Sequence, residues 1–502
     1  MRSPVMLKVL SLYLIKLLKS HLFWLVLIIF VAFGVRFYKI DNPVADWHSW
    51  RQADTAAVAR NFYKEGFTPL MPRGDDMSPM GKDNPNLRRL RFVELPIYNS
   101  LVYFLYLLNG GVDERLARLV SIFMSLGSLV FIYLITKRHW DYFTALLSAF
   151  IFAVLPFNIY FSRVILPEPS LVFFSLGMFY FTERWIFENS RKLFLGSVFF
   201  TAVAFLTKPM AAFYLLPLIL SYWQKEGQIW PIPKRYFLWI ILSFWPIVAW
   251  RIWINQYPDG IPASNWLFNG NGIRFRPAFW KWIVGDRFGR EILTVAGSVL
   301  FALGSLIKPN IREGYILHLF LASSLLFLVV FATGNVMHDY YQTFIIPALS
   351  IFTARGVVLL LRGVGNFLPR LVTIPLAMLL LFLTIYLGWL EVKGLFQVNN
   401  WAIVEAGRFA DKILPKEAVV VAPYGGDTAF LYQVNRPGFP VMVSSVDNLK
   451  KMYGVTHYVS VSLDADTKSL MGQYEIISQT PQFIILDLTR PKPEYTAPKD
   501  LK

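Results

Sequence analysis

The sequence predicts a polytopic α-helical membrane protein with a small α/β domain at its C-terminal end. Composition is the first reason: 55% of the 502 residues are hydrophobic, 16% are charged and the mean hydropathy is +0.46, which is more apolar than one soluble core requires. Length is the second reason, because apolar runs of about 17 to 25 residues recur and each can cross a hydrocarbon core of roughly 30 Å as a helix. The third is a change to short alternating helix and strand patterns after residue 393.

We expect about eleven transmembrane helices, and their orientation follows from the basic residues. Residues 1–21 space lysines among leucines without a cleavage motif, which predicts an amphipathic cytoplasmic helix. The apolar stretch 95–108 is too short to cross and predicts a helix lying in the interface. With that helix outside the membrane, the short connections rich in Lys and Arg all fall on the cytoplasmic side, as the positive-inside rule requires. The expected spans are residues 22–38, 116–136, 142–160, 170–187, 193–207, 210–223, 236–254, 291–307, 314–333, 342–361 and 370–393.

This topology divides the chain at residue 393. Residues 1–393 form the transmembrane domain, in which residues 39–115 are the first outer loop with its interfacial helices, and residues 394–502 form an extracytoplasmic α/β domain. We therefore expect a multi-pass protein of an inner or plasma membrane, with its site and its C-terminal domain on the extracytoplasmic side. In that domain the patterns predict helices at 406–415 and 446–454, strands at 417–423 and 456–462, and a final pair of strands over 474–488.

The composition and motifs of the sequence exclude or disfavour several classes of site and partner. The chain has no cysteine, so disulfides and thiolate catalysis are excluded. The net charge of +17 comes from Lys and Arg scattered between apolar runs, which favours anionic lipid head groups over nucleic acid as partners. The sequence shows no metal-ligand spacing, nucleophile elbow or phosphate-binding glycine loop, so we predict no metal ligands.

The polar stretch 46–66, DWHSWRQADTAAVARNFYKEG, follows the first expected span and is the leading candidate site. Its spacing predicts a helix on whose first turn Arg51 and Asp54 are three residues apart and share a face. A helix N-terminus carries free N–H groups that favour an anion such as phosphate. Asp46 and His48 come directly before that turn. The alternative interpretation is an ordinary surface ion pair, with tryptophans that anchor the chain among head groups.

Further ionisable residues stand at the outer ends of other expected spans. Arg163 and Glu168 flank a turn in FSRVILPEPS, Glu94 begins the interfacial helix, and Lys208 lies between two short apolar runs. Such groups are costly at the membrane boundary unless paired or used, although each could also snorkel to water. Late in the chain, GNVMHDYYQTFIIPALS offers a donor to phosphate and rings that stack on a sugar or lipid, namely His338, Tyr340 and Tyr341.

The order of these motifs resembles that of polyprenyl-phosphate-dependent glycosyltransferases of the GT-C type, particularly bacterial family 39 relatives of protein O-mannosyltransferases and the lipid A aminoarabinose transferase. The resemblance covers about the first 390 residues and lies in an acid in the first outer loop followed by ELP, SRVILPEP, LTKP and HDYYQTFIIPAL. A C-terminal extracytoplasmic α/β domain also occurs in that superfamily. Two departures stand out: relatives usually carry Asp-Glu where this chain has Arg51-Gln52, and some carry Lys-Pro-Pro in place of Glu94-Leu95-Pro96.

The resemblance implies an inverting transfer of a hexose or pentose from a polyprenyl-phosphate donor to an acceptor hydroxyl on a protein, lipid or glycan. A carboxylate, Asp54 or else Asp46, would deprotonate the acceptor as it attacks the anomeric carbon, with His48 between them as a third and weaker candidate, and Glu168 would orient or activate that acceptor. The departing phosphate needs cations or donors but no metal in principle, and whether a divalent metal takes part is left open. Substrate-binding residues would be His48, Arg51, Glu94, Arg163, Lys208, His338, Tyr340 and Tyr341.

Two other functional classes are alternatives to an enzyme. A lipid or polyprenyl-linked sugar transporter or flippase would line a path with charges inside the membrane, but no inverted repeat is evident and the ionisable residues crowd onto one side. A non-catalytic anchor that presents the C-terminal domain is disfavoured by the small size of that domain beside so many spans. We therefore expect a lipid-linked sugar donor, an acceptor and membrane lipids as partners, and no nucleic acid.

Overall fold

The computed structural model describes residues 20–80, 86–311, 313–363 and 368–493. Their contacts divide the chain into two compact units. The helix expected over residues 1–21 lies outside the described residues apart from its last two. Each unit combines segments that are far apart in sequence: unit 1 comprises Met1–Ile40, Leu119–Trp250 and Ser264–Gly394, and unit 2 comprises Asp41–Arg118, Arg251–Ala263 and Leu395–Lys502.

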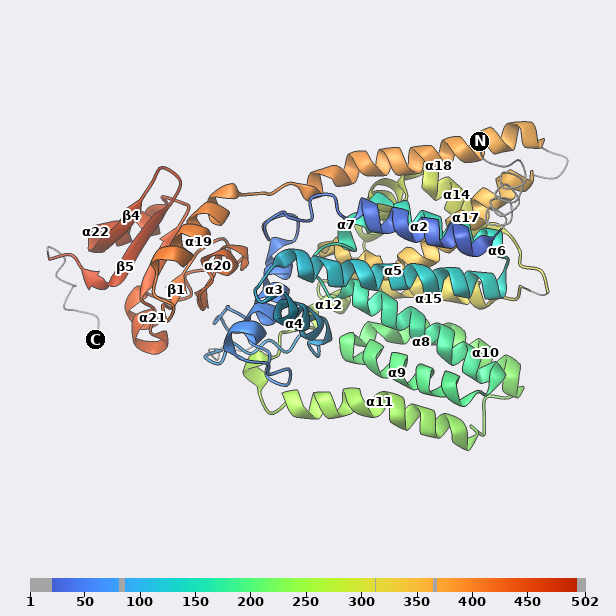
Figure 1. Cartoon of the computed structure of the whole chain (residues 1–502), viewed down its shortest axis with the longest axis horizontal. Helices are drawn as coiled ribbons and strands as arrows, with labels where there is room; N and C mark the ends of the chain where they lie inside the picture. The colour runs from blue at the N-terminus through green and yellow to red at the C-terminus, as the bar shows by residue number, and fades with distance from the viewer. Residues whose placement is uncertain (1–19, 81–85, 312, 364–367, 494–502) are drawn as a thin grey trace, which may run out of the picture. The chain divides into compact units, whose positions relative to one another are not determined.

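Unit 1 is a bundle of helices that run mostly along one direction (Figure 1). Each expected span is largely helical, because an apolar run satisfies its own backbone hydrogen bonds in that form. By length and composition four of the described helical segments could cross a membrane, or five if a pair bent by 109° counts as one, so the larger count stays a prediction. The principal helices are α2 (His21–Val35), α5 (Glu114–His139), α6 (Tyr142–Val154), α7 (Pro156–Phe161), α8 (Glu168–Glu188), α9 (Arg191–Thr207), η1 (Pro209–Leu215), α10 (Leu216–Glu226), α11 (Lys234–Ile254), η4 (Lys281–Ile292), α14 (Thr294–Leu306), α15 (Ile316–Val330), α16 (Ala332–Met337), η5 (Asp339–Ile345), α17 (Ile346–Arg362) and α18 (Arg370–Val392).

Three expected spans are interrupted where a proline begins a new helix. The span expected over 142–160 divides into α6 and α7 at Leu155, directly before Pro156. Those expected over 210–223 and 342–361 begin as the 3-10 helices η1 and η5 and continue as α10 and α17, each with a proline in its first turn. Proline has no N–H and suits a helix start. The expectation of continuous helices was therefore wrong at these places.

Helices α14 and α17 approach each other closely at two glycines. A Cβ atom on Gly304 would lie 1.9 Å from the Phe352 carbonyl oxygen, and one on Gly356 would lie 1.9 Å from the Leu300 carbonyl oxygen. Small residues at such a crossing let two backbones touch, which is a common way to pack helices in a membrane where water supplies no driving force. The two glycines therefore set the distance between these helices.

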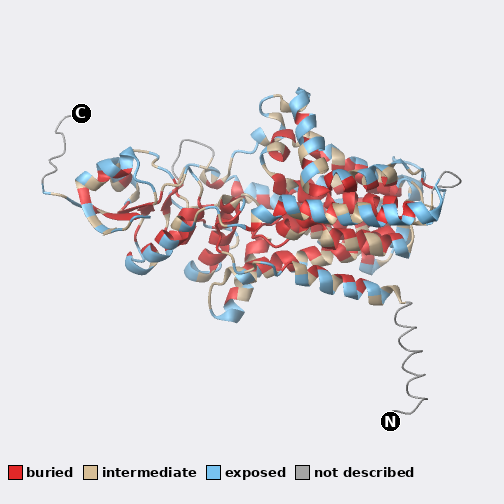
Figure 2. Ribbon diagram, turned by 90° about the horizontal axis from the view of Figure 1, so that it is seen from above, coloured by how far each residue is buried: buried red, intermediate tan, exposed pale blue. Residues whose placement is uncertain are grey.

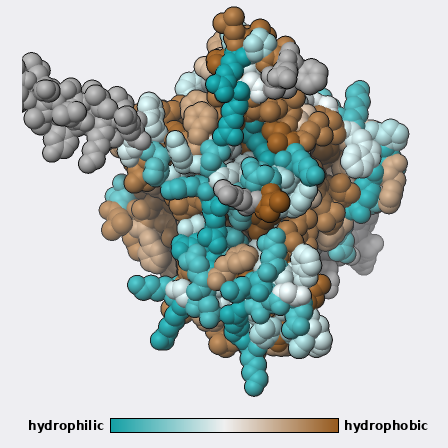
Figure 3. All heavy atoms as spheres, turned by 90° about the vertical axis from the view of Figure 1, so that its right-hand side faces the viewer, coloured by the Kyte–Doolittle hydropathy of each residue, from teal (hydrophilic) through white to brown (hydrophobic). Residues whose placement is uncertain are grey.

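One end of unit 1 gathers basic residues. There Arg138, at the end of α5, lies 2.7 Å from Glu183 of α8, and Arg235, at the start of α11, donates to Asn189 at 2.9 Å. Seen from this end, hydrophilic side chains run across the middle of the face and hydrophobic ones flank them (Figure 3). Within the bundle, buried residues lie on the inward faces of the helices (Figure 2). A charged end with apolar sides is typical of a membrane protein.

Unit 2 contains a five-stranded mixed sheet of order β2-β1-β3-β5-β4. Strand β1 pairs in parallel with β2 and β3, and β5 pairs antiparallel with β3 and β4. Every helix and strand expected for the C-terminal domain is present, because each has a short apolar pattern of the matching period. The elements are α19 (Trp401–Ile413), β1 (Val420–Val421), α20 (Ala429–Val434), β2 (Gly438–Phe439), α21 (Val446–Tyr453), β3 (His457–Ser460), α22 (Ala465–Gln473), β4 (Tyr474–Gln479) and β5 (Ile484–Pro491).

Unit 2 also contains the two helices of residues 39–115, α3 (Ser49–Glu65) and α4 (Ile97–Asn109). Helix α3 is buried along most of its length. Helix α4 buries Tyr98 and Tyr106, whereas Phe104 and Leu108 on its other face are 50% and 86% exposed. An apolar face without cover in a two-faced helix suits the interfacial position expected from the sequence.

Candidate functional site

Helix α3 carries most of the candidate residues of the stretch 46–66. It begins after His48, whose backbone is left-handed with φ of 55°, so the chain turns sharply into the helix. The Asp46 carboxylate is fully buried and accepts a hydrogen bond from Gln52 Nε2 at 2.6 Å. The same amide nitrogen donates to the Trp47 carbonyl at 3.0 Å. Asp46 therefore ties the chain before α3 to the first turn of the helix.

Two ion pairs lie on the face that α3 presents to residues 91–94. Arg51 Nη2 lies 2.9 Å from Glu94 Oε1 and 3.2 Å from Oε2, and the Arg91 guanidinium pairs with the Asp54 carboxylate. None of the four side chains is more than 14% exposed. Arg51 and Asp54 thus share a face, as expected. Each group has a partner from another segment and is largely buried, which differs from the exposed surface pair of the alternative interpretation.

The same four side chains line a small pocket within unit 2. Asn99 Nδ2 donates to the Thr55 carbonyl at 2.6 Å, which fixes α4 against α3 beside the pocket. Two guanidinium groups and two carboxylates meet here, so the formal charges of the pocket cancel. The remaining lining residues are Thr55, Val58, Pro72, Val93, Pro96 and Asn99.

The Asp54 carboxyl has a perturbed acidity. Burial raises its pKa above the ordinary value. The positive charges of Arg91 and Arg51 and a hydrogen bond from Thr428 lower it, whereas Asp76, whose Oδ2 lies 4.0 Å from Arg91 Nη1, raises it. The net shift is upward. A carboxylate with a raised pKa takes up a proton more readily, which is what a general base requires.

The C-terminal part of unit 2 packs directly against α3. Thr428 Oγ1 lies 2.9 Å from Asp54 Oδ1, and Ser49 donates to Asp427 Oδ2 at 2.8 Å. Further along α3, Arg60 Nη1 donates to the Tyr432 carbonyl at 2.8 Å. The Arg60 guanidinium also lies 4.0 Å from the Tyr432 ring centroid, a cation–π distance. Helix α3 is therefore held along its length by residues from the far end of the sequence.

A backbone bridge joins the same two segments at the edge of the sheet. The Gly438 N–H donates to the Asp75 carbonyl at 2.9 Å, and the Met77 N–H donates to the Gly438 carbonyl at 2.8 Å. Asp76 thereby pairs in parallel with Gly438 of β2. A Cβ atom on Gly438 would lie 1.8 Å from the Val420 carbonyl oxygen, so only glycine fits between the two neighbours.

The remaining candidates lie in unit 1. Lys208 pairs with the Glu168 carboxylate, and its Nζ lies 5.3 Å from the Tyr341 ring centroid. The His338 ring stacks on Tyr340 at 5.2 Å and meets Tyr341 edge-on at 5.8 Å. Five predicted residues thus form one cluster, in which a buried cation lies beside aromatic rings.

Arg163 is the remaining candidate of unit 1. It is fully buried, its Nη1 donates to the Lys39 carbonyl at 2.7 Å, and its guanidinium lies 5.5 Å from the Tyr160 ring centroid. Another buried cation, Arg287, which the sequence did not single out, donates to the Val336 carbonyl at 3.2 Å and lies 3.9 Å from Asp339. It therefore braces the segment that carries His338.

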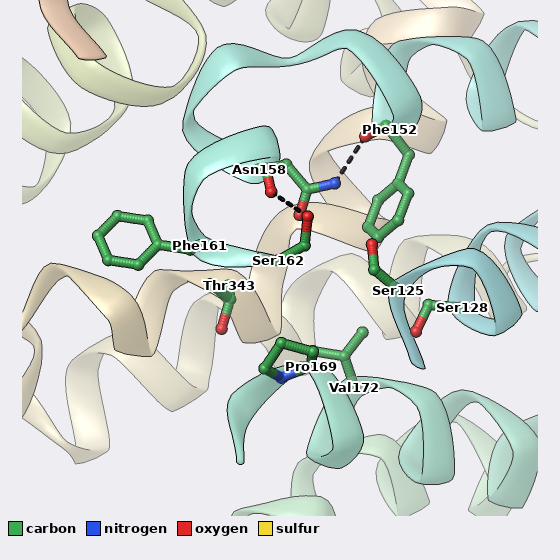
Figure 4. A pocket seen from close by; sticks show the side chains of 9 residues that line it. All are labelled: Ser125, Ser128, Phe152, Asn158, Phe161, Ser162, Pro169, Val172 and Thr343. Carbon is green, nitrogen blue, oxygen red and sulfur yellow. Dashed lines mark hydrogen bonds between the residues drawn. The ribbon is translucent and has the colours of Figure 1, made fainter. Parts of the chain in front are cut away.

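A small hydroxyl-lined pocket lies beside the turn that carries Arg163 and Glu168 (Figure 4). Its serines from α5, Ser125 and Ser128, face a turn in which Ser162 donates to the Asn158 carbonyl at 2.5 Å. Ser162 also accepts a hydrogen bond from the buried Arg36 at 2.7 Å. These contacts fix the turn, and the pocket contains no ionisable side chain in its lining.

The structure thus brings the sequence-predicted residues other than Arg163 together in two groups, one in each unit. Asp46, His48, Arg51, Asp54 and Glu94 gather around α3, and Glu168 and Lys208 join the aromatic cluster of unit 1. Among the residues that the structure describes, no three His, Cys, Asp or Glu side chains gather closely enough to hold a metal ion. The main residues that the sequence did not single out are Arg91, Asp76, Arg287 and Thr428.

This arrangement is the fold of GT-C-type glycosyltransferases. It is similar to the crystal structure of ArnT from Cupriavidus metallidurans bound to undecaprenyl phosphate, with a TM-score of 0.64 and 13% identity over 92% of this chain and 97% of that one. The apo oligosaccharyltransferase of Archaeoglobus fulgidus matches with a TM-score of 0.57 and 12% identity over 88% of this chain and 69% of that one. The oligosaccharyltransferase AglB of the same organism, in complex with an inhibitory peptide and a dolichol-phosphate, matches with a TM-score of 0.56 and 11% identity over 93% of this chain and 74% of that one.

A family match agrees with this fold. Residues 96–253 match the model of the dolichyl-phosphate-mannose-protein mannosyltransferase family. A comparison with curated protein sequences finds no match. The family match supports a glycosyl-transfer enzyme, and the solved structures show the fold; together they confirm the resemblance to GT-C glycosyltransferases predicted from the sequence.

Proposed function

We propose that the protein transfers a sugar, with inversion, from a polyprenyl-phosphate-linked donor to an acceptor hydroxyl on the extracytoplasmic side of a membrane. The observation that carries the proposal is the pocket beside α3, where Asp54, Arg91, Arg51 and Glu94 are buried together. An acid of raised pKa beside two guanidinium groups offers a base and anion-binding groups in one place.

The pocket suits the two charges that change during such a transfer. As the acceptor oxygen bonds to the anomeric carbon, its proton passes to the Asp54 carboxylate, and the bond from that carbon to the phosphate oxygen breaks. The electron pair of that bond leaves with the lipid phosphate. Protonation of Asp54 removes a negative charge from the pocket, so the guanidinium of Arg91 gains attraction for the phosphate as the phosphate gains charge.

Asp46 is less suited to the role of base. Its carboxylate is fully buried and engaged by Gln52 at 2.6 Å, which supports a structural role at the start of α3. Glu94 pairs with Arg51 and thereby fixes the orientation of that guanidinium. We therefore assign the base to Asp54 and the orientation of Arg51 to Glu94.

The residues of unit 1 have proposed roles that follow from the sequence. Lys208 and His338 would stabilise phosphate charge, Glu168 would orient the acceptor, and Tyr340 or Tyr341 would contact the donor. Because Arg163 is fully buried and bound to the Lys39 carbonyl, we propose that it fixes the turn and does not contact the substrate.

The test is transfer of radiolabelled sugar from a panel of polyprenyl-phosphate sugars by membranes that contain the native chain or Asp54→Asn. Loss of a general base lowers the rate by about 10²- to 10⁴-fold, so we expect a loss of that size with donor binding retained. Asp259→Asn is the matched control, because Asp259 belongs to the same unit and pairs with Arg88 at 3.0 Å, outside the pocket.

The outcomes separate the alternatives. Full activity of Asp54→Asn would move the base to Asp46 or Glu168. If the native chain transfers sugar from none of the donors, the proposed enzyme is contradicted and a transporter of lipid-linked sugars becomes the better explanation. Equal losses in Asp54→Asn and Asp259→Asn would point to folding of unit 2 and not to catalysis.

A further inference from the structure

The turn before α20, residues Tyr424–Thr428, contributes a hydroxyl to the pocket acid from more than 370 positions away in the sequence. Thr428 occupies the N-cap position of α20, yet its side chain makes no capping hydrogen bond. The Ala429 N–H instead donates to Asp427 Oδ1 at 2.7 Å. Threonine at an N-cap normally uses its oxygen to accept a hydrogen bond from the first turn of its own helix. Here that oxygen is turned toward α3.

The geometry of the hydroxyl is unusual because it has two acceptors. Thr428 Oγ1 lies 2.9 Å from Asp54 Oδ1 and 3.0 Å from the Trp50 carbonyl oxygen, and the side chain is buried. A hydroxyl carries one hydrogen and can also accept. It therefore donates to only one of these two oxygens at a time.

This arrangement fits both protonation states of the acid. When Asp54 is ionised, Thr428 donates to its carboxylate. When Asp54 carries a proton, Asp54 donates to Thr428 Oγ1, and the threonine hydrogen turns to the Trp50 carbonyl. The carboxyl and the hydroxyl stay hydrogen-bonded to each other in both states, which avoids the usual cost of an unsatisfied polar group on either side chain.

We propose that Thr428 is a positioning residue for Asp54, so that the C-terminal α/β domain supplies part of the apparatus by which the acid accepts a proton. The inference rests on the proposed function, in which Asp54 is the base. It adds that the hydroxyl keeps the carboxylate in place and stabilises both of its states during turnover.

Other charged groups also act on Asp54 and must stay constant in a test. Arg51 faces it from α3, and Arg91 and Asp76 face it from the segments that follow α3. Glu94 acts on Asp54 indirectly, because it pairs with Arg51. A change confined to Thr428 leaves all four in place, so its effect reports on the hydroxyl.

The experiment compares Thr428→Val, which keeps the shape and loses the hydroxyl, with Thr428→Ser, which keeps the hydroxyl. Sugar transfer by full-length chains is measured as a function of pH. A hydrogen bond to a charged group is worth enough to change a rate about 10- to 100-fold. We expect Thr428→Val to lower kcat by this factor with KM little changed, and to move the acidic limb of the pH profile to higher pH. Thr428→Ser should stay close to the native chain.

Thr456→Val is the matched control, because the Thr456 hydroxyl donates to the Val419 carbonyl at 3.2 Å within the same domain and does not contact α3. A second readout does not depend on turnover. The carboxyl band of Asp54, obtained from infrared spectra as the difference between the native chain and Asp54→Asn, is titrated in the native and Thr428→Val backgrounds. We expect the titration to move to higher pH in Thr428→Val.

A native rate and pH profile in Thr428→Val would overturn the inference, even if the infrared titration moves. Equal losses in Thr428→Val and Thr428→Ser, with the pH profile unchanged, would also overturn it, because they would indicate packing. Failure of the proposed function has a different signature: Asp54→Asn would then remain active. Loss of activity in Asp54→Asn together with a native-like Thr428→Val contradicts only the role of the threonine.

Discussion

Two buried acid–cation pairs, Asp54 with Arg91 in unit 2 and Glu168 with Lys208 in unit 1, differ in what surrounds them. Asp54 has a second guanidinium nearby and a hydroxyl at 2.9 Å. Glu168 meets Lys208 through Oε1, whereas its buried Oε2 has no hydrogen-bond partner in the part of the chain that the structure describes. The first carboxylate is supported on several sides, and the second is not.

The difference indicates which of the two pairs can change its charge at low cost. A carboxylate in a connected network can take up a proton while its neighbours keep partners. A buried carboxylate with fewer partners is held by its cation, and removal of that cation leaves a costly unpaired charge. We therefore expect Asp54 to act in proton transfer, and Glu168 to stay ionised as the counter-ion of Lys208 while it orients the acceptor.

The largest effect on stability should come from Lys208→Met. This change leaves the Glu168 carboxylate buried without its cation, and loss of one partner of a buried pair costs about 3–5 kcal/mol. The free energy of unfolding, followed by tryptophan fluorescence of the purified chain in detergent, measures it. The double variant Glu168→Gln with Lys208→Met should recover most of the loss, because no charge then remains buried.

Arg91→Met is the counterpart of that experiment in unit 2. We expect a smaller loss of unfolding free energy, because Arg51 and Thr428 still support the Asp54 carboxylate. A loss in Arg91→Met that exceeds the loss in Lys208→Met would contradict the comparison between the two pairs.

A second prediction concerns the pH dependence of sugar transfer. Asp54 acts in its ionised form, and its raised pKa places the acidic limb of kcat/KM above the range of an ordinary aspartate. The charge of Arg91 favours the ionised form, so Arg91→Gln should raise the pKa further and move that limb to higher pH. The pH profile of kcat/KM checks this sign, and Arg88→Gln, on an exposed pair, should leave it in place. A shift of the limb to lower pH in Arg91→Gln would rule out Asp54 as the titrating group.

The smallest effect should come from Arg88→Ala. Arg88 pairs with Asp259 at 3.0 Å and its side chain is 48% exposed. Exposed ion pairs contribute about 0–1 kcal/mol because water and salt screen them. The same unfolding measurement gives the baseline for the other two variants, and a loss above about 1 kcal/mol would mean that exposure alone does not separate the pairs.

The helices could be predicted from the sequence because a long apolar run determines its own backbone hydrogen bonds. Several short elements of the C-terminal domain were predictable for a related reason, since each carries its own period, but α20, β2 and α22 were not predicted. The breaks at Pro156 and at the starts of α10 and α17 were missed, although the prolines that cause them are visible in the sequence. When the two helices on either side of a break are both apolar, the sequence shows one continuous apolar run, and hydrophobicity alone does not indicate the break.

The partners of the site could not be predicted. Asp54 meets Arg91 across 37 positions and Thr428 across 374, and sequence spacing gives no information on such contacts. The residues on one turn of α3 were predictable because they depend only on helical geometry. The basic run just before Glu94 was the available signal for Arg91. Thr428, in the short motif GDTAF, gave no signal strong enough to use.

The bridge between Asp76 and Gly438 joins two segments that the ribosome makes far apart in time, so the fold around α3 cannot be completed early in synthesis. A ribosome that adds about 5–20 residues per second needs on the order of tens of seconds to pass from the first of these residues to the second. Until then α3 lacks the residues that cover it, Thr428 and Tyr432 among them. A nascent chain would therefore expose one face of α3 for that interval, and chaperones and proteases could act on it until residues 428–438 have been made.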